Sequence, residues 1–139
     1  MITEYLTERD LYSLTNACDV YVSLHRAEGF GLGIAEAMSL GKAVIATDYS
    51  ATTEFCRPGT ALLVPFKMVS NDEQGFAGRI GDSWAEPDVD AAARALRCLY
   101  DNPQLRNDLG NRAKAFICDY FSIENVRRSV ESFLGVSEP

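Results

Sequence analysis

The sequence predicts an α/β domain with a parallel sheet and helices on both faces of that sheet. Three short apolar runs, residues 20–24, 43–46 and 61–64, are rich in side chains that favour strands. Each run is continuously apolar rather than alternating, which is typical of a strand that is buried on both faces. Helical patterns alternate with these runs, and that alternation indicates a parallel sheet.

Before the first strand, Leu11, Leu14 and Ala17 recur at helical spacing behind a start at Thr7 or Glu8, so a short helix is predicted within residues 7–17. Between the second and third strands lies a polar connection, residues 48–55. Its hydroxyl groups either cap a short helix or face a ligand, and the sequence leaves both possibilities open.

Residues 67–87 form the longest segment without a clear period, and an irregular segment of that length is usually functional or mobile. Its glycines are Gly75, Gly78 and Gly81. The only tryptophan, Trp84, also lies here, and we expect it to anchor the segment on the domain rather than to stack on a ligand.

Two amphipathic helices and a capped third helix are predicted to complete the domain. The apolar stripe of the first helix comprises Val89, Ala92, Ala93, Leu96 and Leu99, and that of the second comprises Leu105, Leu109, Ala113, Phe116 and Ile117. Ser122 can cap the third helix, with Phe121 and Val126 placed as a hydrophobic staple.

Length and composition fit one ordinary globular domain. The chain has 139 residues, of which 47% are hydrophobic and 24% are charged. A net charge of −7 argues against nucleic acid or an anionic membrane as a partner, although backbone amides can still bind a phosphate. No apolar run is long enough to span a membrane and no signal-peptide pattern opens the chain, so a cytoplasmic protein is expected.

The four cysteines Cys18, Cys56, Cys98 and Cys118 are widely spaced, and the chain has one histidine. There is no C-x-x-C pair, so neither a zinc site nor a redox motif is predicted. Reduced thiols are the simplest interpretation, and no metal or cofactor is expected.

The candidate site is the nonapeptide at residues 28–36, which joins the first strand to a helix. Its three alternating glycines allow a sharp turn and a close approach to a ligand. If a helix begins near Gly31 or Leu32, its first-turn amides and its dipole favour a phosphate. Glu36 then lies one turn later and leans back toward those amides, while Glu28 faces them from the loop.

This stretch resembles the motif of the retaining family-4 (group 1) glycosyltransferases, in which two glutamates stand eight positions apart around Gly-Phe-Gly. The similarity extends to residues 18–24, 36–47, 60–65 and 102–106, and therefore to nearly the whole chain. It differs from the G-x-G-x-x-G fingerprint of dinucleotide-binding domains, which is absent.

The resemblance implies that residues 1–139 are one partial domain with an incomplete Rossmann-like parallel sheet, the C-terminal, donor-binding half of a GT-B glycosyltransferase. Such a domain usually has about six parallel strands, and the three found here correspond to the last three. The early strands, the basic residues that grip the diphosphate in the family, and the acceptor domain have no counterpart. Residues 1–139 are then either a fragment of a longer enzyme or a short natural protein.

By the same resemblance, Glu36 accepts hydrogen bonds from the ribose of a nucleoside-diphosphate sugar. Glu28 lies beside the donor sugar and is the candidate catalytic residue. The backbone amides that bind sugar hydroxyls and phosphate oxygens come from Gly29, Phe30, Gly31 and Leu32, and the Phe30 ring can simply pack. His25 and Arg26 are either exposed loop residues or, for Arg26, a cation near the phosphate, and both interpretations stay open.

The implied reaction is sugar transfer with retention and without a metal, onto an acceptor that is a saccharide, a lipid or a protein glycan. The chain alone is expected to be inactive and to self-associate through the unpaired edge at residues 20–24. One alternative is a non-catalytic nucleotide-sugar-binding or interaction domain. Another is a flavodoxin-like regulatory domain, which would need an acidic pocket that Asp19 and Asp48 do not form convincingly.

Overall fold

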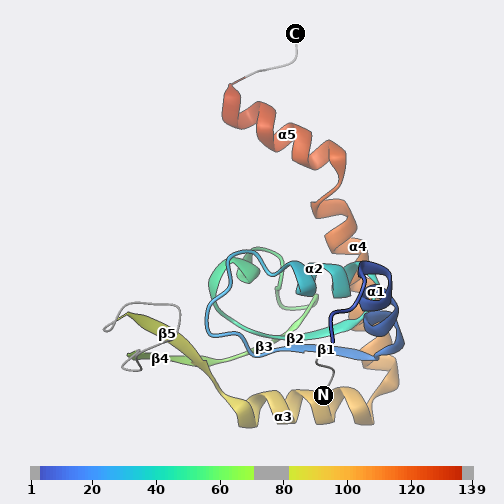
Figure 1. Ribbon diagram of the computed structural model, residues 1–139, viewed down its shortest axis with the longest axis vertical. Helices are drawn as coiled ribbons and strands as arrows, with labels where there is room; N and C mark the ends of the chain where they lie inside the picture. The colour runs from blue at the N-terminus through green and yellow to red at the C-terminus, as the bar shows by residue number, and fades with distance from the viewer. Residues whose placement is uncertain (1–3, 71–81, 136–139) are drawn as a thin grey trace.

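The computed structural model describes residues 4–70 and 82–135 (Figure 1). Its elements in chain order are α1 (Glu8–Ala17), β1 (Val20–Ser23), α2 (Leu32–Ser39), β2 (Ala43–Thr47), the 3-10 helix η1 (Ser50–Glu54), β3 (Leu62–Val64), β4 (Phe66–Ser70), β5 (Ser83–Pro87), α3 (Val89–Asp101), α4 (Pro103–Tyr120) and α5 (Ile123–Leu134).

The central sheet is parallel with the order β1-β2-β3, which confirms the predicted α/β class. Val20 pairs with Ala43 and Ile45 pairs with Leu62. Every residue of β2 is buried, as its apolar run predicts. The expectation of burial on both faces is wrong for β1, where Val22 is 43% exposed. β1 is an edge strand of this sheet, so fewer neighbours cover it.

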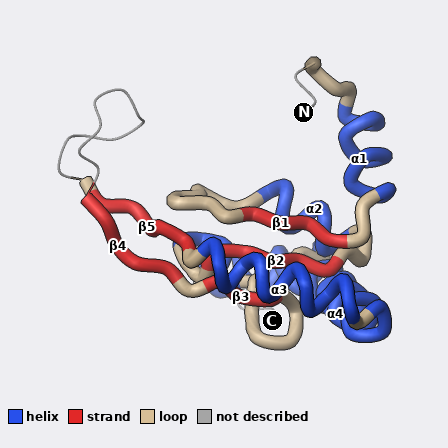
Figure 2. Tube along the Cα trace, turned by 90° about the horizontal axis from the view of Figure 1, so that it is seen from below, coloured by secondary structure: helices blue, strands red, loops and turns tan. Residues whose placement is uncertain are grey.

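Helices cover both faces of the sheet, with α2 on one side and α3 on the other (Figure 1). One apolar core joins α2 and the two residues that follow η1, Phe55 and Cys56, to the sheet, and a second joins α3 to the opposite face. In Figure 2, α3 lies across β2 and β3. α4 contributes to both cores, because Ala113 and Ile117 belong to the first and Leu109 to the second.

Helix α4 crosses the turn between α2 and β2 at Gly110 with no room for a side chain. A Cβ on Gly110 would lie 2.1 Å from the Gly41 carbonyl oxygen. Gly41 itself has a φ of 75°, in the left-handed region that glycine adopts without strain. These two glycines therefore set how closely α4 approaches the central strand.

The predicted irregular segment at residues 67–87 is partly wrong, because both of its ends form strands. β4 and β5 pair antiparallel, with Met68 opposite Ala85. Figure 2 shows this hairpin extending beyond the central sheet. The three glycines of the predicted segment, Gly75, Gly78 and Gly81, lie outside the described residues. The backbone pairing satisfies hydrogen-bonding groups that an irregular segment would have left to solvent.

The amphipathic stripe of α3 is rotated from the predicted one. Ala92 and Leu99 are buried as expected, whereas Val89 is 60% and Leu96 is 44% exposed. Ala95 packs against the core instead. In α4 the outcome is similar, since Leu109, Ala113 and Ile117 are buried and Leu105 is 37% exposed.

Both terminal helices have a side-chain cap and bury no residue; Ser122 is the predicted cap, and Thr7 is one of the two predicted starts. Thr7 accepts a hydrogen bond from the Asp10 amide at the start of α1, and Ser122 accepts one from the Asn125 amide at the start of α5. Figure 1 shows α5 projecting away from the sheet. Both helices thus present apolar side chains outward, Leu11 and Leu14 among them.

Candidate functional site

Helix α2 begins where the glycine-rich motif predicts. Gly31 is its N-cap, with a φ of 90°, and the Gly31 carbonyl accepts hydrogen bonds from the Ile34 and Ala35 amides at 3.0 Å. Leu32 and Gly33 form the first turn, where backbone amides have no intrahelical acceptor. The start of α2 therefore presents N–H groups and the positive end of the helix dipole.

The three alternating glycines of the motif are needed for different reasons. A Cβ on Gly31 would lie 2.5 Å from the Thr52 methyl group, and one on Gly33 would lie 2.6 Å from the Tyr21 hydroxyl. Both glycines make room for other parts of the protein. A Cβ on Gly29 would meet nothing within 4 Å. Only Gly29 therefore leaves open space of the kind that the ligand-approach interpretation requires.

Glu36 lines a cavity of about 330 Å³ with Phe30 and Leu32, against Cys118 and Phe121 of the end of α4. This cavity joins three of the predicted site residues. The carboxylate of Glu36 also receives a hydrogen bond from α1, because the Tyr12 hydroxyl lies 3.4 Å from Glu36 Oε1. The negative charge of Glu36 is the main cause that raises the pKa of Tyr12.

Tyr21 extends from β1 into the same region, and both glutamates affect the pKa of its hydroxyl. Burial is the main cause that raises its pKa, and the charges of Glu36 and Glu28 raise it further. Its hydroxyl also lies against Gly33 at the start of α2. Tyr21 therefore belongs to the candidate site, although no motif in the sequence indicates it.

Glu28 lies half-buried in the loop between β1 and α2, and its backbone is hydrogen-bonded to the first residue of η1. Its amide donates to Ser50 Oγ at 3.3 Å, and Ser50 Oγ donates to its carbonyl oxygen. The Glu28 carboxylate accepts from the Phe30 amide, with Oε1 at 3.4 Å. Of the amides expected to bind a ligand, that of Phe30 is thus already bonded to Glu28.

The polar connection after β2 forms a short helix, η1, whose hydroxyl groups are bonded to protein. The N-cap residue Tyr49 makes no side-chain capping bond. Thr52 Oγ1 instead donates to the Tyr49 carbonyl at 3.1 Å, and the Thr53 hydroxyl donates to the Ser50 carbonyl at 2.8 Å. The capping interpretation of this segment is therefore wrong in detail, because the hydroxyl groups turn back to carbonyl oxygens.

His25 and Arg26 both join the glutamate loop, residues 24–31 between β1 and α2, to other elements. His25 Nε2 lies 3.0 Å from the Tyr49 carbonyl oxygen. The Arg26 guanidinium pairs with Glu86 at 2.7 Å and stacks on Trp84, 4.7 Å from the ring centre. Arg26 therefore contacts β5, and Trp84 anchors its segment on the domain as predicted.

The ring of Phe30 packs, as expected, in an aromatic cluster. Its centre lies 5.8 Å from that of Phe55 and 5.5 Å from that of Phe121. Because Phe55 is buried in the core, this cluster connects the motif to the domain interior. It fixes the wall of the cavity that Glu36 lines.

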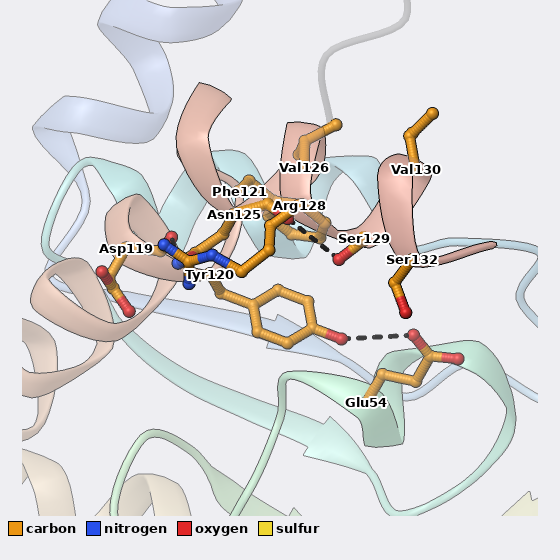
Figure 3. Close-up of a pocket in the computed structure, with 10 residues that line it drawn as sticks. All are labelled: Glu54, Asp119, Tyr120, Phe121, Asn125, Val126, Arg128, Ser129, Val130 and Ser132. Atoms are coloured by element: carbon orange, nitrogen blue, oxygen red, sulfur yellow. Dashed lines mark hydrogen bonds between the residues drawn. The ribbon is translucent and has the colours of Figure 1, made fainter. Parts of the chain in front are cut away.

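A larger groove of about 790 Å³ lies between η1 and α5 (Figure 3). In this groove the Tyr120 hydroxyl donates to Glu54 at 3.5 Å. Phe121 borders both cavities, but neither motif glutamate lines the groove. The smaller cavity therefore carries the chemistry that the motif suggests.

The described residues contain neither a metal-binding cluster nor a membrane-spanning helix. No group of three or more His, Cys, Asp or Glu side chains in residues 4–70 and 82–135 could hold a metal ion. Within the same residues, no helix is long and apolar enough to cross a membrane.

The model of the family "Glycosyl transferases group 1" matches residues 1–116. The chain belongs to this family. A curated relative of this group 1 domain is "Putative glycosyltransferase EpsD" of Bacillus subtilis (strain 168), 31% identical over 105 residues. That match covers 76% of the chain and 23% of EpsD.

Solved structures share the fold of this group 1 domain. Sucrose-phosphate synthase from Thermosynechococcus elongatus matches with a TM-score of 0.68 and 23% identity over 95% of the chain. HepE from Anabaena, in complex with UDP, matches with a TM-score of 0.62 and 20% identity over 89% of the chain. The match covers 29% of each of these two structures. The chain thus spans less than a third of the relatives that it matches.

Proposed function

We propose that this group 1 glycosyltransferase domain binds a nucleoside-diphosphate sugar at the start of α2 and, within a longer enzyme, transfers the sugar with retention to an acceptor. One observation carries the proposal: a carboxylate, Glu36, lines a cavity at the amide-presenting end of a helix. Solved structures of the related HepE contain UDP, UDP with glucose, or UDP-glucose, which supports a donor of this class.

Each part of the donor has a matching group in this arrangement. The ribose hydroxyls are donors, and Glu36 offers several lone pairs to accept them. The diphosphate is anionic, and the amides of Leu32 and Gly33 together with the dipole of α2 favour negative charge. The sugar then lies by Gly29 and Glu28, on the open side of the motif.

Departure of the nucleoside diphosphate is the step that this end of the helix can assist. Negative charge grows on the diphosphate as the bond to the anomeric carbon breaks. Amides that already point at that position stabilise the charge without having to reorient. The proposal includes no metal, because the helix amides take this role, and Glu28 beside the sugar is the candidate catalytic residue.

A longer enzyme is part of the proposal because the chain covers 23% of EpsD and 29% of HepE. The acceptor side of the cleft then lies outside residues 1–139, and these residues alone bind donor without transferring sugar. The same coverage favours a second candidate function, a non-catalytic nucleotide-sugar-binding domain. We further propose that the domain is cytoplasmic and that its β1 edge pairs with another chain.

The two glutamates give the direct test, by calorimetric titration of UDP and UDP-glucose into the 139-residue chain. Glu36→Gln should weaken both ligands by about 1.5–3 kcal/mol, because a hydrogen bond to a charged group is lost. Glu28→Gln should leave UDP binding nearly unchanged, since its side chain faces the sugar. Glu54→Gln is the matched control, because Glu54 lines the other groove.

Equal weakening of UDP by Glu28→Gln and Glu36→Gln would refute this division of roles. Turnover is measured separately, as release of UDP from UDP-glucose in the presence of saccharide, lipid and protein acceptors. Transfer by purified 139-residue chain would contradict the proposed need for a longer enzyme.

A further inference from the structure

Ser50 has a backbone conformation that its residue type rarely adopts. Among the described residues it is the only non-glycine with a positive φ, at 71°. Such a conformation persists in a non-glycine residue only where the surrounding contacts hold it, and it often occurs at functional sites. Hydrogen bonds hold Ser50 at two points, because its carbonyl oxygen accepts from the Thr53 hydroxyl and its own hydroxyl bonds a residue of another segment.

That hydroxyl bonds both backbone polar groups of Glu28. Ser50 Oγ accepts from the Glu28 amide at 3.3 Å and donates to the Glu28 carbonyl oxygen. The two residues are 22 positions apart, so one side chain ties two separate loops together. A methyl group or a hydrogen atom at position 50 could make neither bond.

Two further contacts join the same loops on either side of Glu28. Three residues before it, His25 Nε2 lies 3.0 Å from the Tyr49 carbonyl oxygen. Three residues after it, Gly31 packs so closely on Thr52 that a Cβ would lie 2.5 Å from the methyl group. Tyr49 and the start of η1 therefore hold the glutamate loop on both sides of Glu28, and Ser50 makes the central contact.

We propose that Ser50 is a positioning residue for Glu28. Ser50 holds the loop in the conformation that places the Glu28 carboxylate beside the sugar. The loop is then ordered before the sugar binds, so binding does not have to offset the entropy cost of ordering it. This inference rests on the proposed function, in which Glu28 faces the donor sugar. Glu36 and the first-turn amides belong to α2 itself, so the nucleotide half of the donor does not depend on Ser50.

The first experiment needs no ligand. Hydrogen exchange is measured on the 139-residue chain and on the variants Ser50→Ala and Ser50→Gly. Both variants should speed exchange of the Glu28 amide, about tenfold for one to two lost hydrogen bonds, while amides within α2 exchange as before. Ser13→Ala is the matched control, because its hydroxyl donates to the Arg9 carbonyl within α1, away from both residues of the Ser50–Glu28 contact. Unchanged exchange at Glu28 in both variants would overturn the proposal.

The second experiment compares UDP with UDP-glucose by calorimetry on the same variants. Affinity for UDP-glucose should fall about fivefold to tenfold in both, with UDP affected less than about twofold. The comparison of Gly with Ala separates positioning from stability, because glycine relieves the positive φ and alanine does not. A purely structural role predicts that the loss occurs with Ser50→Ala and disappears with Ser50→Gly, which would overturn the proposal.

The two experiments also separate the failure of each hypothesis. If the unmodified chain binds neither UDP nor UDP-glucose, the proposed function is refuted for this donor class, and exchange at Glu28 still decides whether Ser50 holds the loop. If both ligands bind and the Ser50 variants weaken them equally, the proposed function stands and the positioning role of Ser50 is refuted.

Discussion

Replacing Gly33 by alanine tests the geometry at the start of α2, because the added methyl group would meet a single atom. An ideal Cβ on Gly33 lies 2.6 Å from the Tyr21 hydroxyl oxygen and 3.5 Å from the ring carbon that bears it. The first distance is shorter than real Cβ contacts, whereas the second is ordinary van der Waals contact. The clash therefore depends on one oxygen atom.

The magnitude follows from two opposing effects. Overpacking a filled site costs about 1–3 kcal/mol, while alanine is favoured over glycine in a helix by at most about 1 kcal/mol. Gly33→Ala alone should therefore destabilise the fold by about 1–2 kcal/mol. In a Tyr21→Phe background the oxygen is gone, and the same substitution should be neutral or stabilising by up to about 1 kcal/mol.

The assay is urea unfolding of the four chains of this double-mutant cycle, followed by far-ultraviolet circular dichroism. Midpoints are compared only where the slope with urea is unchanged. Gly29→Ala is the control, because its Cβ would meet nothing within 4 Å, and its effect should stay within about 0.5 kcal/mol. If Gly33→Ala costs the same with and without the Tyr21 hydroxyl, the reasoning from this contact is refuted.

Two other predictions concern the thiols and the sheet edge. UDP-glucose should protect Cys118 from alkylation, because this exposed thiol lines the cavity of Glu36, whereas Cys98 on α3 should react equally with and without ligand. Cys56 should stay unmodified in the folded chain at pH 8, since burial raises its pKa to about 12. Peptide mass mapping measures the modification of all three cysteines. Alkylation of Cys118 that is unaffected by UDP-glucose would contradict the proposed site. Val22→Lys should shift the chain toward the monomer in sedimentation, because a charge on the exposed edge strand β1 opposes pairing with another chain. Hydrogen exchange that shows unprotected β1 amides in a well-folded monomer of the unmodified chain would contradict self-association.

The start of α2 could be predicted from sequence because its causes are local. Gly31 supplies the left-handed turn, and the helical spacing of apolar residues begins directly after it. The same holds for the caps Thr7 and Ser122, whose side chains bond amides three residues away. Each of these signals lies within one turn of the feature that it determines.

The hairpin and the role of Ser50 could not be predicted because their causes are distant in the chain. β5 is a poor strand by itself, with Glu86 and Pro87 at its end, and it forms because β4 pairs with it. Ser50 meets Glu28 across 22 positions, and no local pattern encodes that contact. The rotation of the α3 stripe likewise depends on the sheet surface, which places Leu96 outward.

The stacking of Arg26 on Trp84 gives the molecule an intrinsic optical reporter. Trp84 is the only indole in the chain, and the residue on its ring face lies two positions before Glu28. The Ala85 amide also donates to the Arg26 carbonyl at 3.0 Å, so both the backbone and the side chain of Arg26 contact β5. Fluorescence emission will therefore follow rearrangement of the glutamate loop, while unwinding of α5, which projects from the sheet, will leave the emission unchanged.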